Sequence, residues 1–154
     1  MAFAHNTPCA PVSTLEALAY AHSGEGTVVC ALDARRAQVY SAAFDLATHQ
    51  RLMEDGARAV KDLASFVQNC KKPVFFVGDG AALCYNEYSQ IPGVLAVPPA
   101  LRTPRGAAVA MVGRRMAQEG LAVPPEALLP DYHRLSQAER ERAERLAAQS
   151  PQNG

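Results

Sequence analysis

The chain has 154 residues, with 15 basic and 15 acidic side chains and a mean hydropathy of −0.09. This length suits one globular domain that buries about two thirds of its unfolded surface. The balanced charge excludes the global basic character of nucleic-acid-binding domains, so any contact with RNA would have to be local. No apolar run approaches the roughly 20 residues of a membrane span, and residues 1–10 do not resemble a signal peptide.

The four cysteines lie far apart in the sequence and form no CxxC pair. They are Cys9, Cys30, Cys70 and Cys84. Most of them lie in apolar runs, where cysteine packs as a small hydrophobic residue. This pattern favours a reducing compartment without disulfides, and we expect a cytoplasmic protein.

The first helix is predicted to begin at Thr14. Ser13 and Glu16 have the spacing of a capping box, in which both side chains satisfy free amides of the first turn. Three apolar residues follow at helical spacing and form one face: Leu15, Leu18 and Ala19. The helix is expected to end near His22, before a glycine-containing gap.

The stretch that follows predicts a β-hairpin. Residues 27–32 (TVVCAL) are apolar without polar alternation, which indicates a strand buried on both faces. Residues 33–37 (DARRA) supply a turn, and residues 38–44 alternate as the second, antiparallel strand. In the turn, Asp33 beside Arg35 and Arg36 is interpreted as part of a stabilising ion pair. The alternative is a catalytic acid or a metal ligand.

Helices and strands alternate in the rest of the chain. The patterns predict a helix over 61–70, a buried strand over 73–77, a helix from Asp79 to about residue 87, and a weak strand over 93–97. A further helix is predicted from Thr103 and Pro104 to Gly120. Together with the hairpin, this order favours an α/β fold with a mixed sheet and flanking helices.

Several side chains invite a functional reading. Asp79, between Gly78 and Gly80, could border a phosphate at a helix N-terminus, but a helix cap is the preferred interpretation. Tyr40 and Tyr132 are interpreted as packing residues. The histidines show no metal-ligand spacing: His5, His22, His49 and His133. A local arginine cluster could contact RNA or form solvated helix surface: Arg102, Arg105, Arg114 and Arg115.

The residues show no credible nucleophile and base pair and no glycine-rich phosphate cradle. We therefore expect no catalytic, cofactor or metal site. A binding or scaffold protein is favoured over an enzyme, and the alternative is a small stand-alone α/β hydrolase or acyltransferase with Asp33 or Asp79 in its site.

Residues 12–19 (VSTLEALA) and 31–40 (ALDARRAQVY) resemble the TsaB family, also called YeaZ. The matching positions in these segments are Ser13, Glu16, Asp33, Arg35, Arg36 and Tyr40. The likeness continues at Gly78 and Gly80 and extends to about residue 139. The closing pattern of the family is matched by Pro130, Tyr132, Arg134, Ser136, Ala138 and Glu139.

The resemblance implies the second lobe of an actin-like, ribonuclease H-like ATPase fold. It also implies a non-catalytic subunit that pairs with the related protein TsaD and works with the small ATPase TsaE. That complex attaches a threonylcarbamoyl group to the adenosine next to the anticodon of tRNA, which such a subunit would contact only indirectly.

The sequence departs from the family pattern at the start, because the opening Asp-Thr strand and the Gly-Pro-Gly-Ser-Phe-Thr-Gly loop are missing. We therefore expect a first-lobe remnant over 1–11, a second-lobe domain over 12–135, a polar helix over 136–149 and a disordered tail over 150–154. An uncovered apolar face would favour a homodimer. Pairing with TsaD depends largely on the first lobe in the family, which leaves the activity of a truncated chain open.

Two smaller departures concern single residues. Ala37 stands where the family often has glycine, which leaves the type of the hairpin turn open, because only glycine adopts positive φ freely. His133 stands where the family usually has an aliphatic residue.

Overall fold

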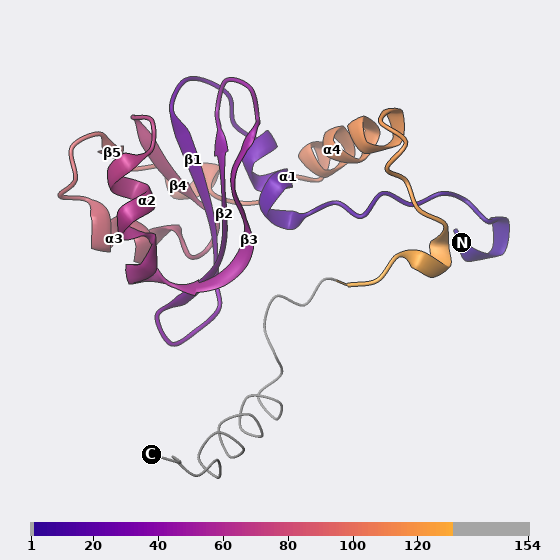
Figure 1. The fold of residues 1–154 in the computed structure, drawn as a ribbon, viewed down its shortest axis with the longest axis horizontal. Helices are drawn as coiled ribbons and strands as arrows, with labels where there is room; N and C mark the ends of the chain where they lie inside the picture. The colour runs from indigo at the N-terminus through magenta and orange to yellow at the C-terminus, as the bar shows by residue number, and fades with distance from the viewer. Residues whose placement is uncertain (1, 131–154) are drawn as a thin grey trace, which may run out of the picture.

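The computed structural model describes residues 2–130 of the chain. Within them, five strands form one sheet in the order β3-β2-β1-β4-β5 (Figure 1). The strands are β1 (Thr27–Asp33), β2 (Gln38–Asp45), β3 (Arg51–Ala59), β4 (Val74–Val77) and β5 (Val94–Leu95). β1 pairs antiparallel with β2 and parallel with β4, so the predicted mixed sheet is confirmed.

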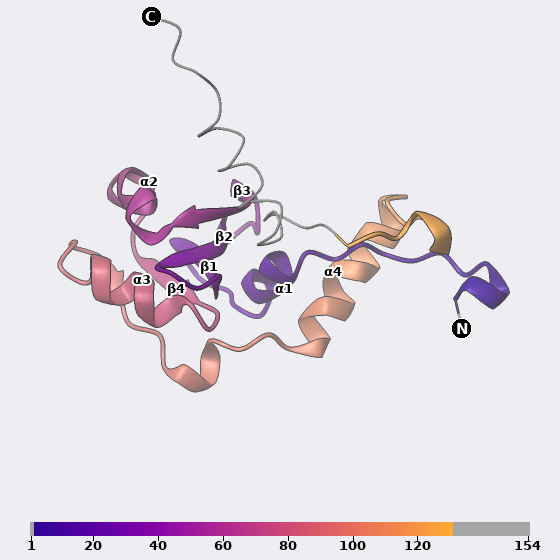
Figure 2. The same ribbon diagram turned by 90° about the horizontal axis from the view of Figure 1, so that it is seen from below.

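Helices cover both faces of this sheet (Figure 2). The α-helices are α1 (Thr14–Tyr20), α2 (Ala64–Asn69), α3 (Ala81–Tyr88) and α4 (Gly106–Gln118). The short 3-10 helices are η1 (Phe3–His5), η2 (Val60–Leu63), η3 (Pro99–Leu101) and η4 (Pro125–Ala127). α2 and α3 lie on one face and α1 on the other, while α4 packs against α1 away from the sheet. No helix in this part of the chain has the length and apolarity needed to cross a membrane.

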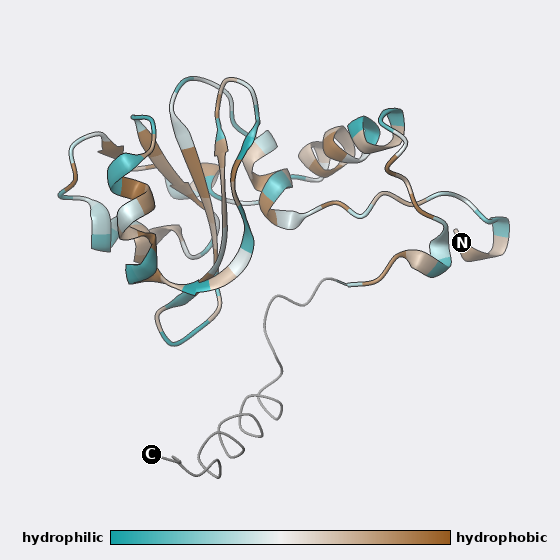
Figure 3. Cartoon of the chain, viewed as in Figure 1, coloured by the Kyte–Doolittle hydropathy of each residue, from teal (hydrophilic) through white to brown (hydrophobic). Residues whose placement is uncertain are grey.

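The central strand β1 is buried on both faces over most of its length, as its unbroken apolar pattern predicts (Figure 3). In β1, Val29 and Ala31 face the core under α2 and α3, whereas Val28 and Cys30 face the core under α1. All four are fully buried. The sheet therefore separates two cores, and the period of two along each strand assigns its residues to one or the other.

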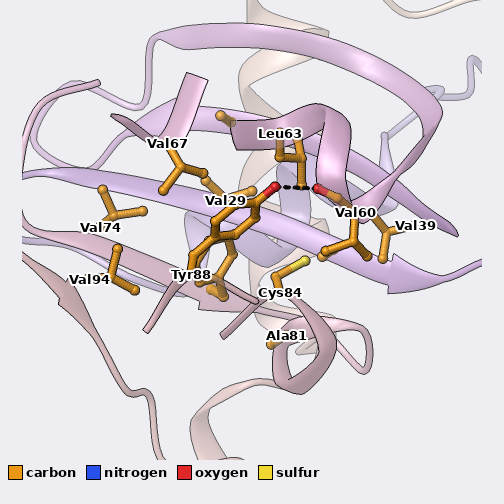
Figure 4. Packing of buried hydrophobic residues seen from close by; sticks show 13 residues of the cluster. Val29, Val39, Val60, Leu63, Val67, Val74, Ala81, Cys84, Tyr88 and Val94 are labelled. Carbon is orange, nitrogen blue, oxygen red and sulfur yellow. Dashed lines mark hydrogen bonds between the residues drawn. The ribbon is translucent and has the colours of Figure 1, made fainter. Parts of the chain in front are cut away.

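Tyr88 anchors the core under α2 and α3 (Figure 4). Its hydroxyl donates a 2.5 Å hydrogen bond to the carbonyl of Val60, and its ring stacks on Phe76 with centroids 6.0 Å apart. Burial, helped by the nearby acidic groups Glu87, Cys84 and Asp62, raises the pKa of this phenol to about 12. The contact joins the end of α3 to η2.

The structure corrects several sequence predictions. β3 was not predicted: it is an edge strand whose residues RLMEDGARA mix charges, glycine and apolar side chains, as edge strands often do. The helix expected over 61–70 is divided into η2 and α2. The helix expected from Thr103 begins at Gly106 without a side-chain cap. Residues 131–154, with the predicted polar helix and tail, lie outside the described residues.

Candidate functional site

The hairpin turn is held by Asp33. One carboxylate oxygen of Asp33 accepts a 2.7 Å hydrogen bond from the backbone amide of Arg35, and the other lies 3.7 Å from the Arg35 guanidinium. Arg35, Arg36 and Ala37 have φ values of 66°, 55° and 55°. Three successive left-handed residues explain why glycine would suit the position of Ala37. The ion pair interpreted from the sequence is present.

A second turn, at the end of β4, lies against the end of β1. The Asp79 carboxylate accepts a 2.8 Å hydrogen bond from the backbone amide of Asp33, and the Gly80 amide donates to the Ala31 carbonyl at 3.0 Å. Gly78 has φ of +100°, and a Cβ there would lie 2.1 Å from the Ala31 carbonyl oxygen. The glycine turn therefore permits the close approach of the two strand ends.

The interpretation of Asp79 as a helix cap is wrong. α3 has Gly80 at its N-cap and no side-chain cap, because the Asp79 carboxylate is turned toward β1. A cavity of about 330 Å³ lies beside this turn and is lined in part by Asp79, Arg102 and Thr103. The Arg102 guanidinium donates to the Val97 carbonyl at 2.6 Å.

The start of α1 carries the second group of family-motif residues. The Ser13 hydroxyl oxygen accepts a hydrogen bond from the Glu16 amide at 3.2 Å, which confirms the predicted cap. The same hydroxyl donates to the Asp55 carboxylate of β3 at 2.5 Å. Asp55 in turn pairs with Arg51. Glu16 does not complete a reciprocal capping box among the described hydrogen bonds, because its carboxylate points toward two arginines.

Glu16 connects three elements that are distant in the sequence. Its carboxylate lies 3.2 Å from Arg51 of β3 and 2.5 Å from Arg115 of α4. Arg115 also pairs with Glu119 at 2.8 Å, and its guanidinium lies 5.8 Å from the centre of the Tyr20 ring. The side chain of Glu16 is only 15% exposed, so the pairs are partly desolvated. This polar junction fixes α4 to the body of the domain.

A groove of about 890 Å³ opens beside this junction, and the sequence did not predict it. Ser13 and Asp55 form its polar part, and Leu32 and Tyr40 of the hairpin reach it from the sheet. The remaining lining residues are Ala10, Pro11, Val12, Thr14, Leu15, Val109, Leu128, Leu129 and Pro130. The structure therefore brings Ser13, Tyr40 and Pro130 of the family-motif positions to one apolar surface.

Other predicted site residues are dispersed. Arg36 lies exposed in the hairpin turn, and the four-arginine cluster is divided, since Arg102 and Arg115 are bound within the fold. The histidines, cysteines and carboxylates of residues 2–130 form no group of three that could hold a metal ion. Cys9, Cys30, Cys70 and Cys84 are free thiols. Tyr132, His133 and Arg134 lie outside the described residues.

Burial separates the cysteines into two kinds. Cys30 and Cys84 are fully buried, whereas Cys9 and Cys70 are partly exposed. Desolvation raises the pKa of the Cys84 thiol to about 12, and it raises the pKa of Cys30 as well. These two thiols are packing residues with little thiolate character at neutral pH.

The strand order and the helices on both faces define a ribonuclease H-like α/β lobe. Solved structures of two proteins from Pseudomonas aeruginosa are among those that share this fold. YeaZ from Pseudomonas aeruginosa has a TM-score of 0.60 and 23% identity, with 85% of this chain and 62% of that chain covered. An uncharacterized protein with similarity to peptidase YEAZ from Pseudomonas aeruginosa has a TM-score of 0.56 and 21% identity, with 80% and 57% covered. The chain thus spans about three fifths of the length of these structures.

The family model of TsaD, described as tRNA N6-adenosine threonylcarbamoyltransferase, matches residues 1–142. The chain therefore belongs to the TsaD family. No curated protein sequence matches the chain. The solved structures confirm the fold that the resemblance to TsaB (YeaZ) implies. The family model confirms the wider family to which that resemblance points.

Proposed function

We propose that this chain acts as a TsaB-like partner subunit that pairs with a TsaD-type subunit, assisted by a TsaE-type ATPase. The complex would attach threonylcarbamoyl to the adenosine next to the anticodon of tRNA. The observation that carries the proposal is the TsaD family match over residues 1–142, on a chain with the YeaZ fold. In this proposal the chain contributes a binding surface and performs no chemistry.

The geometry of the two candidate carboxylates favours a structural role. Asp33 binds the amide and guanidinium of Arg35, and Asp79 binds the amide of Asp33. Each carboxylate is engaged in holding a turn, whereas a general base needs a free oxygen directed at substrate. The groove beside Ser13 and Tyr40 offers an apolar surface of the kind that a partner covers.

The role can be tested by co-purification and by transfer assays. An affinity-tagged TsaD-type subunit from the same organism is mixed with this chain and passed through a size-exclusion column. Transfer to tRNA is then measured with TsaD-type and TsaE-type proteins, with and without the chain. We expect a stable complex and faster transfer when the chain is present, and no transfer by the chain alone.

A version of the chain extended by a first lobe taken from a YeaZ protein serves as the matched comparison. Binding by the extended version alone would contradict the partner role of this chain. Hydrolase or acyltransferase activity of the isolated chain that disappears in Asp33→Asn or Asp79→Asn would instead support the stand-alone enzyme.

A further inference from the structure

The groove beside Ser13 and Asp55 is left open by the described residues. Its volume of about 890 Å³ lies within the range of ligand pockets, about 300–1,000 Å³, so it has room for several side chains. Three apolar side chains on its walls stay exposed: Val109 at 42%, Leu128 at 42% and Leu129 at 76%. Such a surface gains free energy when another apolar group covers it.

The last residues that the structure describes form part of this groove. Leu128, Leu129 and Pro130 all line it, and the chain continues from Pro130 to Gly154. A fully extended chain covers at most about 3.6 Å per residue, so residue 132 lies within about 7 Å of Pro130 and residue 135 within about 18 Å. The residues that directly follow Pro130 are therefore within reach of the groove.

The sequence places its apolar side chains close to this point. Between Pro130 and Leu146, the only apolar side chains larger than alanine are those of Tyr132 and Leu135. Residues 136–145 (SQAERERAER) are mostly charged or polar, and such side chains lose free energy when they enter an apolar groove. The short segment 131–135 is thus the part of the remaining chain that gains most from covering the groove.

Tyr132 matches the groove in its chemistry. The walls are mostly apolar, while Ser13 and Asp55 supply polar atoms. A tyrosine combines an apolar ring with a hydroxyl that takes a hydrogen-bond partner when it is buried. We propose that residues 131–135 fold back over the groove and that the ring of Tyr132 fills it beside Leu32.

The covalent connection favours this segment over a second molecule. A segment joined to its site by a short tether has an effective concentration in the millimolar range, provided that the chain can span the distance. The same segment of a second copy would need a comparable concentration to replace it. The inference holds whether or not the chain pairs with a TsaD-type subunit, and any partner that used the groove would have to displace Tyr132.

Methyl NMR of the complete chain tests the proposal. In a sample with isotope-labelled leucine and valine methyl groups, we expect nuclear Overhauser effects between the Tyr132 ring and the methyl groups of Leu32 or Val109, which both line the groove. Tyr132 ring protons that show no such effects and have the chemical shifts of an unstructured tyrosine would overturn the proposal.

Tyr132→Ala tests the same contact by substitution. Loss of the aromatic ring should shift the methyl resonances of Leu32 and Val109 and leave those of Val94, in the core under α2 and α3, in place. Leu146→Ala is the matched control, because it removes an apolar side chain farther along the same segment. We expect no shift at the groove for the control, and equal shifts in both variants would contradict the role of Tyr132.

A mixture of labelled and unlabelled chains separates contacts within one molecule from contacts between two. Nuclear Overhauser effects that arise within single chains support the proposal. Effects seen only between a labelled and an unlabelled chain would overturn it and assign the groove to Tyr132 of a second copy. None of these results depends on a TsaD-type subunit, so co-purification tests the proposed function separately.

Discussion

The carboxylate of Glu16 in α1 lies 2.5 Å from the guanidinium of Arg115 in α4, 99 residues further along the chain. Among the described helices and strands, α4 packs chiefly on α1, and this pair is the charged part of that contact. Arg51 binds the same carboxylate from β3, so one side chain links the sheet to the outlying helix.

Replacement of Glu16 by glutamine should loosen α4. Glu16→Gln leaves two partly buried guanidinium groups without their shared counter-charge, and we expect a loss of about 1–3 kcal/mol in the free energy of unfolding. Hydrogen exchange of α4 (Gly106–Gln118) should accelerate more than exchange in β1. Glu119→Gln is the control, because the Glu119 side chain is 46% exposed and its pair with Arg115 should contribute less than about 1 kcal/mol. Equal losses of stability in Glu16→Gln and Glu119→Gln would contradict the role of Glu16 as the shared partner of Arg51 and Arg115.

Replacement of Ala37 by glycine should stabilise the hairpin. Ala37 has φ of +55°, a conformation that costs an L-residue about 1–2 kcal/mol relative to glycine. Part of this gain is lost to the greater freedom of glycine in the unfolded chain, so a net gain of about 0.5–1 kcal/mol is expected in urea unfolding. Ala47 lies in the next turn without a positive φ, and Ala47→Gly should be destabilising. A loss of stability in Ala37→Gly would show that the turn does not have this conformation in solution.

Most of the central fold could be predicted from the sequence because its strands and helices follow from patterns of neighbouring residues. β1 and β2 follow from an apolar run and an alternating run, and the start of α1 follows from the Ser13 cap. β3 could not be predicted, since an edge strand needs little apolar periodicity, and its position depends on pairing with β2. The Arg58 guanidinium donates a 2.6 Å hydrogen bond to the Ser41 carbonyl, beside a register shift, and so strengthens that pairing. No local sequence pattern predicts this contact.

The candidate site was predicted in its parts and not in its arrangement. The sequence indicated Ser13, Glu16 and Asp33 individually, each through a local motif. The partners of these residues come from elsewhere in the chain: Asp55 for Ser13, Arg115 for Glu16, and Asp79 for the backbone of Asp33. Non-local contacts of this kind follow only from the topology of the sheet and helices.

Replacement of Gly78 by alanine should disrupt the junction of β1 and β4. The added Cβ would lie 2.1 Å from the Ala31 carbonyl oxygen, which belongs to backbone that is fixed by the pairing of β1 with β2. Steric overlap and the positive φ together should cost about 3 kcal/mol or more in thermal or urea unfolding. Gly24→Ala separates the two causes, since Gly24 has φ of +144° with no atom within 4 Å of the new Cβ. We expect about 1–2 kcal/mol for that control, and equal losses for both variants would contradict the close approach at Gly78.

The stability of the domain should fall as the pH drops through the range in which histidine titrates. Desolvation lowers the pKa of His22 from its ordinary value of 6.5, and the positive charge of Arg105 lowers it further, against an opposing contribution from the Leu101 backbone. The Nε2 atom of His22 is buried without a hydrogen-bond partner among residues 2–130. Below pH 6.5 the unfolded chain therefore binds a proton that the folded chain takes up only at lower pH.

This difference in bound protons sets the direction in which the free energy of unfolding changes with pH. The unfolded state binds more protons between the lowered pKa and 6.5, so the free energy of unfolding decreases as the pH falls through that window. Urea midpoints measured from about pH 7 to about pH 5 should decline for the wild type and decline less for His22→Gln. His5→Gln is the control, because His5 is exposed in η1. Hydrogen bonds from Thr48 lower the pKa of Asp45 below 3.8, which places its titration outside the window. A profile of the same slope in wild type and His22→Gln would assign the pH dependence to other groups.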